Sequence, residues 1–123
     1  MTVTPRTKRQ YEDAVSKIVA AFYSKNIGFG PRETRVYIVD DMVIVRLKGR
    51  LMPMEEMLLK AEHGYRIVKD LRKQLHEVTT KELGPEIAKI LGYKVVGSHS
   101  DISTRSGERL EVFILDRKFE AAD

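Results

Sequence analysis

The sequence predicts one α+β domain of the order helix, hairpin, helix, hairpin, with a four-stranded antiparallel sheet packed against the long second helix and the N-terminal helix. Three observations lead to this prediction. Helical spacing of apolar residues begins after residue 7, it returns in a longer segment, and each helical segment precedes a β-branched stretch with its own turn signal. At 123 residues the chain has the size of one domain. We divide it into a disordered lead (1–7), one domain (8–117) and a frayed tail (118–123).

The first helix is predicted to begin at Lys8, with Thr7 as its N-cap. Apolar side chains then recur on one face, at Tyr11, Ala14, Val15, Ile18, Val19 and Phe22. Glycine and proline between residues 26 and 31 end the helix. Gly28 and Gly30 precede a strand rather than open a helix, so they fit helix termination better than a phosphate-binding loop.

The first hairpin is predicted over residues 34–48, with Asp40 and Asp41 as a two-residue turn. In that register the core face takes Val36, Ile38, Val43, Val45 and Leu47. Arg35 and Arg46 oppose each other on the other face, beside Lys48. Like charges at this spacing often indicate a bound anion or a nearby carboxylate. Two interpretations follow: an ionic girdle with Asp101 and Glu111, or a small-anion or phosphate pocket formed by Arg35, Arg46 and Lys48.

The second helix is predicted to begin at Pro53, which suits a first helical turn. Its apolar residues alternate steps of four and three, at Met57, Ala61, Gly64, Val68, Leu71, Leu75 and Val78. This stripe either pairs two long helices in a dimer or lies across the chain's own sheet. Pro85 removes a helix donor, which predicts a break or kink near Leu83 before a short last segment that ends at Gly92.

The second hairpin is predicted around Arg105-Ser106-Gly107, with Gly107 in the left-handed conformation. If Thr104 opposes Glu108, the core face takes Val96, Ile102, Leu110, Val112 and Ile114, and the other face takes His99, Asp101, Ser103, Arg109, Glu111 and Phe113. Asp101 would then face Glu111. Together with His99, the two carboxylates would form an oxygen-rich cation site, or they would titrate as a coupled pair. Alternatively, Arg109 and Lys94 neutralise the carboxylates. The candidate ligand-binding residues are therefore Arg35, Arg46, Lys48, His99, Asp101, Ser103, Arg109 and Glu111.

Composition narrows the classes of function. The chain has no cysteine, which excludes a thiol nucleophile and a disulfide framework and favours a reducing cytoplasm. A net charge of +4 assists anion binding without requiring it. Glu62, Asp70 and Glu77 dilute the basic residues of the second helix, which argues against nucleic-acid binding by this helix. We assign no catalytic residue, cofactor or metal. No apolar run could cross a bilayer, so a membrane role would be peripheral, at the inner face.

Two stretches of the chain, GFGPRETRVYIVDDMVIVRLKGRLMPMEEML and YKVVGSHSDISTRSGERLEVFILD, resemble the MpsC family over residues 8–117. The family is named for the soluble component of a Na+-translocating membrane-potential-generating system. The residues that carry the resemblance are Gly28, Gly30, Pro31, Arg35, Asp41, Gly49, Leu51, Pro53, Glu56, Asp101, Ser103, Thr104, Gly107 and Glu108.

The resemblance implies a small bacterial cytoplasmic protein associated with membrane systems that take up dissolved inorganic carbon, such as bicarbonate, or move cations. We therefore expect a non-enzymatic accessory or regulatory protein that forms a homodimer and contacts a membrane transport protein. The alternative is a binding module for a small anion, a nucleotide or nucleic acid that uses the basic sheet face.

Overall fold

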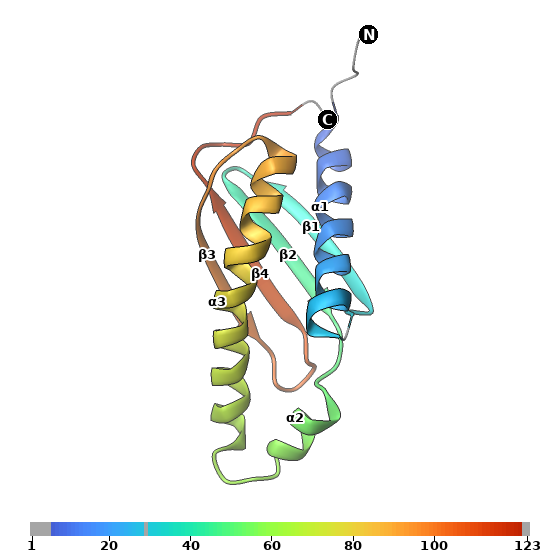
Figure 1. Cartoon of the computed structure of the whole chain (residues 1–123), viewed down its shortest axis with the longest axis vertical. Helices are drawn as coiled ribbons and strands as arrows, with labels where there is room; N and C mark the ends of the chain where they lie inside the picture. The colour runs from blue at the N-terminus through green and yellow to red at the C-terminus, as the bar shows by residue number, and fades with distance from the viewer. Residues whose placement is uncertain (1–5, 29, 122–123) are drawn as a thin grey trace.

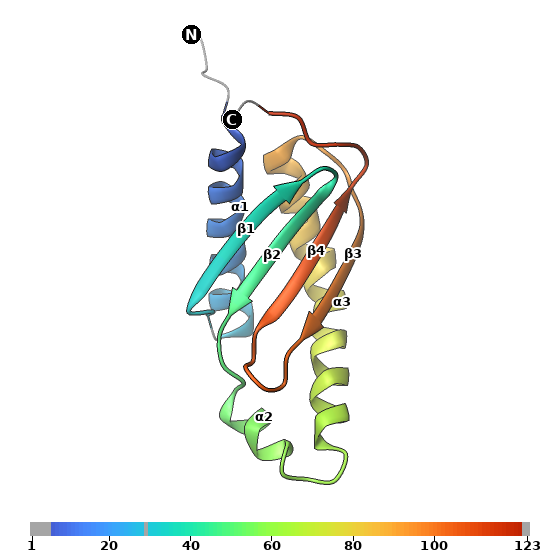
Figure 2. The same cartoon turned by 180° about the vertical axis from the view of Figure 1, so that it is seen from behind.

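The computed structural model describes residues 6–28 and 30–121, and it confirms the predicted α+β class. One antiparallel sheet has the strand order β1-β2-β4-β3. Two helices, α1 (Lys8–Phe22) and α3 (Gly64–Leu91), lie on the same side of it (Figure 1). The view from behind shows that no helix of the described residues covers the other side of the sheet (Figure 2). The molecule therefore has two layers and one open sheet face. Residues 1–5 of the predicted lead lie outside the described part.

Helix α1 begins and ends where its sequence predicts. The hydroxyl of Thr7 accepts a hydrogen bond from the Gln10 N–H, and the Gln10 side chain accepts one from the Thr7 N–H, which makes a capping box. The helix continues as one π-helical segment, η1 (Tyr23–Ile27), before Gly28 turns the chain with a φ of 77°. Glycine accepts this left-handed conformation without steric strain.

The first hairpin, β1 (Glu33–Val39) and β2 (Met42–Lys48), has the predicted register. Val39 pairs with Met42, and Arg35 pairs with Arg46. The predicted core residues of this hairpin are all buried beneath the helices: Val36, Ile38, Val43, Val45 and Leu47. The period-two pattern of β-branched residues therefore determined both the turn and the buried face.

The second helical segment differs from its prediction at two places. A short helix, α2 (Pro53–Leu58), ends first, and the chain turns back through His63, whose φ is 66°. A Cβ on Gly64 would lie 1.6 Å from the Leu58 carbonyl oxygen, so the turn brings the two backbones together where only glycine fits. In addition, α3 does not break near Leu83; it continues through Pro85 to Leu91.

Burial explains why α3 continues through its proline. The apolar side chains on either side of it, Leu83 and Ile87, are fully buried, and Leu91 is nearly so. Burying such side chains contributes about 1.5–3 kcal/mol each, whereas a proline inside a helix costs about 3 kcal/mol. The packing of this face therefore outweighs the lost helix donor.

The second hairpin, β3 (Val95–Ile102) and β4 (Arg109–Leu115), is one residue out of the predicted register. Ile102 pairs with Arg109, and Ser100 rather than Asp101 pairs with Glu111. Gly107 does have a positive φ, of 79°, but the connection runs from residue 103 to 108 and is longer than the three-residue loop that we expected.

The register shift reverses the faces of β4. The strand buries Arg109, Glu111, Phe113 and Leu115 beneath the helices, and its three remaining apolar residues point to the open face: Leu110, Val112 and Ile114. Of the predicted core residues of this hairpin, only Ile102 is buried, and Val96 is 63% exposed. A shift of one residue moves every side chain of a strand to the opposite face.

The core lies between the sheet and the two helices, and its largest cluster consists of Val15, Val19, Tyr23, Val36, Ile38, Val43, Val45, Leu47, Leu83, Ile87, Leu91, Phe113, Leu115 and Phe119. Phe119 belongs to the tail that we expected to fray. It is 8% exposed, and its N–H donates to the Asp40 carbonyl at 2.8 Å. The tail is therefore anchored at this residue.

The two hairpins join within the chain through the pairing of β2 with β4. No helix in the described part of the chain has the length and apolar character needed to span a bilayer.

Candidate functional site

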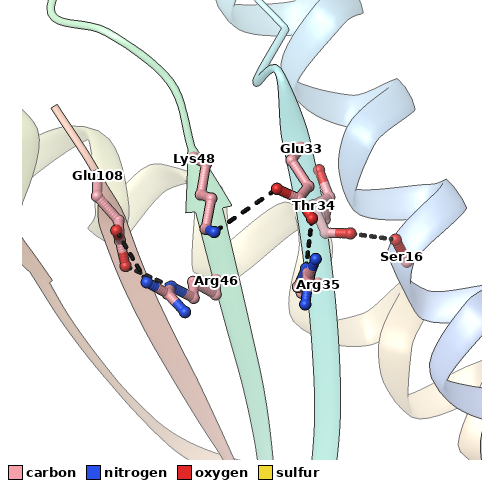
Figure 3. A network of polar contacts seen from close by, with 7 residues as sticks. All are labelled: Ser16, Glu33, Thr34, Arg35, Arg46, Lys48 and Glu108. Atoms are coloured by element: carbon pink, nitrogen blue, oxygen red, sulfur yellow. Dashed lines mark hydrogen bonds and ion pairs between the residues drawn. The ribbon is translucent and has the colours of Figure 1, made fainter. Parts of the chain in front are cut away.

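The basic residues of the first hairpin lie on the open sheet face, each beside a carboxylate (Figure 3). Arg35 donates to Glu33, and Lys48 lies 3.7 Å from the other oxygen of that carboxylate. Arg46 donates to both oxygens of Glu108, at 2.6 and 3.3 Å. These hydrogen bonds hold the pKa of the Glu108 carboxyl below its usual value. An ionic girdle therefore occupies one end of the face, but its acidic members are Glu33 and Glu108 rather than Asp101 and Glu111.

The predicted cation site of the second hairpin is not assembled. Glu111 is completely buried beneath the helices, whereas His99 and Asp101 are exposed on β3. Asp101 accepts a hydrogen bond from Lys69 of α3 at 2.8 Å, and this pair lowers the pKa of its carboxyl. The register shift described above separates the two carboxylates, so the predicted facing of Asp101 and Glu111 is wrong.

Ser103 belongs to the connection between the two strands. Its N–H donates to the Glu108 carbonyl at 2.8 Å, and its own carbonyl accepts from the Gly107 N–H at 2.7 Å. A Cβ on Gly107 would lie 2.6 Å from backbone atoms of Arg50 and Leu51. The loop thus packs against the connector that follows β2, and this contact explains the requirement for glycine at position 107.

A buried polar cluster, which sequence reasoning missed, lies between the helices and β4. It consists of Tyr23, His76, Arg109 and Glu111, none more than 8% exposed. The Tyr23 hydroxyl donates to Oε1 of Glu111 and accepts from Nη1 of Arg109 at 2.7 Å. Nδ1 of His76 lies 3.5 Å from Oε2 of Glu111. Burial and the Glu111 carboxylate raise the pKa of the Tyr23 hydroxyl, so the tyrosine is held neutral.

A second buried ion pair lies next to this cluster, between α2 and α3. Arg72 donates to both oxygens of Glu55, each at 2.6 Å, and Glu55 also accepts the Met52 N–H at 2.9 Å. Burial alone would raise the pKa of the Glu55 carboxyl. The hydrogen bonds from Arg72 and Met52 outweigh it, and the pKa lies below its usual value. The pair fastens the short helix to the long one.

The sequence contained a signal for the buried cluster, although a weak one. His76 shares the helical spacing of Val68, Leu83 and Ile87, which are all core residues of α3. A histidine at such a position needs a polar partner inside the protein. The partner, Glu111, comes from a strand whose register had first to be known, so spacing alone could not identify it.

A groove between α3 and β3 leads to the buried cluster. Its volume is about 660 Å3, and Arg109 and His76 are among its lining residues. A much smaller apolar pocket of about 70 Å3 lies on the other side of Arg109, against Ile27, Leu71 and Leu75. Arg109 therefore separates a polar groove from an apolar pocket.

These features define a small two-layer α+β protein that encloses an ionic cluster between its helices and leaves the other face of its sheet open. Comparison with known proteins identifies the family to which this protein belongs. The chain belongs to the MpsC family, described as a Na+-translocating membrane potential-generating system, whose model matches residues 7–117.

Two relatives come from Bacillus subtilis (strain 168). The uncharacterized protein YbcI is 35% identical over 115 residues, which cover 94% of this chain and 93% of that protein. The uncharacterized protein YrhF is 24% identical over 112 residues, covering 90% and 88% respectively. No solved structure matches the chain.

Proposed function

We propose that this protein is a non-enzymatic accessory protein of a membrane transport system and that it works as a homodimer formed through its open sheet face. The observation that carries the proposal is the inverted pattern of β4, which buries Arg109 and Glu111 and exposes Leu110, Val112 and Ile114. A sheet face that meets water normally carries the polar residues of such an alternation. An apolar outer face is what a second protein surface would cover.

Neighbouring strands continue this apolar surface. Tyr37 and Val39 of β1 are 42% and 48% exposed, and Ile44 of β2 lies between them and β4. Apolar residues therefore extend from the centre of the face to the turn of the first hairpin, and the ionic girdle lies at the opposite end. This arrangement of apolar centre and polar margin is typical of protein interfaces.

Charge and area favour a second copy of the chain as the partner. The girdle carries three cations and two carboxylates, so each copy can offer carboxylates to the cations of the other across a two-fold axis and the net charge of each girdle is small. Four strands of about seven residues make a face of roughly 450 Å2, and two such faces would bury about 900 Å2. Stable interfaces bury about 1,000 Å2 or more, which predicts a weak dimer that dissociates on dilution.

The oligomeric state tests this proposal directly. Sedimentation velocity over a range of protein concentrations should show a monomer that converts to a dimer as concentration rises. Leu110→Lys on the open face should shift the equilibrium to monomer. Val78→Lys is the matched control, because Val78 is 57% exposed on α3, in the stripe that could instead pair two long helices. A wild-type monomer at every concentration, or a dimer broken only by Val78→Lys, would remove the sheet-face dimer.

The link to transport is supported by the family description and needs its own test. Deletion of the gene in its own organism should reduce Na+-dependent uptake of inorganic carbon, and the wild-type gene should restore it. The Leu110→Lys variant should restore it poorly if self-association is required. Unchanged uptake in the deletion strain would refute the accessory role while leaving the dimer measurement intact.

A further inference from the structure

The groove between α3 and β3 has the volume of a small-molecule site and a polar lining. Its volume of about 660 Å3 lies within the usual range of ligand sites, roughly 300–1,000 Å3. Hydroxyl groups line both walls, from Thr80 on α3 and from Ser98 and Ser100 on β3. Nothing in the proposed dimer uses these residues, because they lie on the helix side of the sheet.

Arg109 lines this groove and carries a charged donor that the described part of the protein leaves without a partner. Its side chain is 6% exposed. Nη1 donates to the Tyr23 hydroxyl, whereas Nη2 is buried and has no hydrogen-bond acceptor among the residues that the structure describes. A buried donor of a charged group is strongly unfavourable when unpaired, so such an atom points to a bound molecule.

The neighbouring carboxylate does not supply the missing acceptor, because Arg109 approaches Glu111 through Nη1, 3.6 Å from Oε1, and Nη2 makes no hydrogen bond to it. One oxygen of Glu111 accepts the tyrosine hydroxyl, and the other faces Nδ1 of His76 at 3.5 Å. The second ring nitrogen of His76 lies 3.2 Å from the Thr80 hydroxyl, which in turn accepts from Ser98 at 3.4 Å. Hydrogen bonds therefore run from Ser98 through Thr80 to His76 and stop there. Among the described residues, three buried atoms of the cluster have no hydrogen-bond partner, namely Nδ1 of His76, Oε2 of Glu111 and Nη2 of Arg109. Of these, Nη2 of Arg109 is the charged donor.

The charges around the groove limit what it can bind. Its ionisable lining residues are Lys69, Arg72, Lys73, Lys81 and Arg109, the carboxylates Asp70, Glu77 and Asp101, and the histidines His76 and His99. Two of the cations already have carboxylate partners, since Lys69 pairs with Asp101 and Arg72 pairs with Glu55. The remaining lysines are balanced by Asp70 and Glu77, so a polyanion such as nucleic acid would meet as much repulsion as attraction.

We propose that the groove binds a small organic monocarboxylate, with a carboxylate oxygen on Nη2 of Arg109 and the rest of the molecule between Lys73 and Ser100. The guanidinium group presents its donors in a geometry that matches a carboxylate. A single negative charge satisfies the unpaired donor, and Glu111 beside Arg109 and the carboxylates of the lining repel it less than they would repel a dianionic phosphate. The proposal is independent of self-association through the opposite face.

Titration of the full-length protein with sodium acetate, sodium propionate and inorganic phosphate, against sodium chloride of equal ionic strength, tests the site. The readout is two-dimensional NMR of arginine and histidine side chains. We expect either carboxylate to shift the Arg109 and His76 signals to saturation, with a dissociation constant in the millimolar range. Arg109→Lys should weaken binding roughly tenfold, because lysine keeps the charge but loses the forked geometry. Arg105→Lys, on the exposed loop, is the matched control.

Ser100→Leu provides a second variant that keeps the Arg109 side chain. It places a branched side chain in the groove and should abolish the shifts even if Arg109→Lys fails to fold. Shifts equal to those with chloride, or equal binding by Ser100→Leu, would overturn the site. Tighter binding of phosphate than of either carboxylate would overturn the assignment of the ligand.

Discussion

Replacing Tyr23 with phenylalanine tests whether the buried cluster stabilises the fold. The substitution removes one oxygen and keeps the aromatic ring, which is 3% exposed and belongs to the main core. That oxygen accepts from Nη1 of Arg109 at 2.7 Å and donates to Oε1 of Glu111. In the variant two buried ionised groups each lose a hydrogen-bond partner.

The expected loss follows from these two bonds. A hydrogen bond to a charged group contributes about 1.5–3 kcal/mol, and leaving a buried partner unpaired adds its desolvation. The two losses overlap, because Arg109 and Glu111 lie 3.6 Å apart and can partly compensate each other. We therefore expect the free energy of unfolding to fall by about 3 kcal/mol. For a chain of this size that corresponds to a decrease in Tm of roughly 12 °C.

Urea unfolding followed by far-UV circular dichroism measures this loss. Tyr93→Phe is the matched control, since the Tyr93 hydroxyl accepts a single hydrogen bond, at 2.9 Å, from the exposed N–H of Glu120. That variant should stay within about 0.5 kcal/mol of the wild type. If Tyr23→Phe is equally mild, the cluster contributes little and the reasoning from buried partners is refuted.

Three further predictions follow from the ion pair of α2 and from the loop of the second hairpin. Arg72→Met should lower the free energy of unfolding by about 3 kcal/mol at neutral pH, because the substitution leaves the Glu55 carboxylate buried and unpaired. A loss below about 1 kcal/mol in urea unfolding would contradict this prediction. In the wild type the lowered pKa of Glu55 contributes stability that is present above its unfolded value of about 4.5 and is lost as pH falls through the folded value. The difference between wild type and Arg72→Met should therefore shrink in acid, and a constant difference from pH 7 to pH 3 would contradict this. Gly107→Ala should be at least about 2 kcal/mol more destabilising than Gly92→Ala. Both glycines have positive φ, but of the two only Gly107 would place a Cβ 2.6 Å from backbone atoms. Equal thermal unfolding of the two variants would show that this contact is not tight.

The first half of the fold could be predicted closely because its signals are local. The cap at Thr7, the turn at Asp40 and the register of the first hairpin depend on residues that are neighbours in sequence. A two-residue turn leaves one pairing for the strands, and the alternation of β-branched residues then assigns the buried face.

The existence of the second hairpin and the left-handed conformation of Gly107 were predicted, but the length of the loop and the register were not. Its connection is longer, so the loop alone does not determine the pairing, and an apolar alternation at Leu110, Val112 and Ile114 favoured the wrong face. The same error produced the predicted cation site, because that prediction placed Asp101 opposite Glu111 in a register that the structure does not have.

The sequence by itself determined the class of fold, the order of the elements and the burial of the first hairpin, since propensity, capping and periodicity act over a few residues. Only the tertiary structure decided which face of β4 is buried, because that choice places Glu111 beside Tyr23 of η1 and His76 of α3. Buried polar groups need partners, and these partners are distant in the chain. The same choice turned an apolar strand surface outward and placed Arg109 at the groove, which produced both surfaces proposed here for binding.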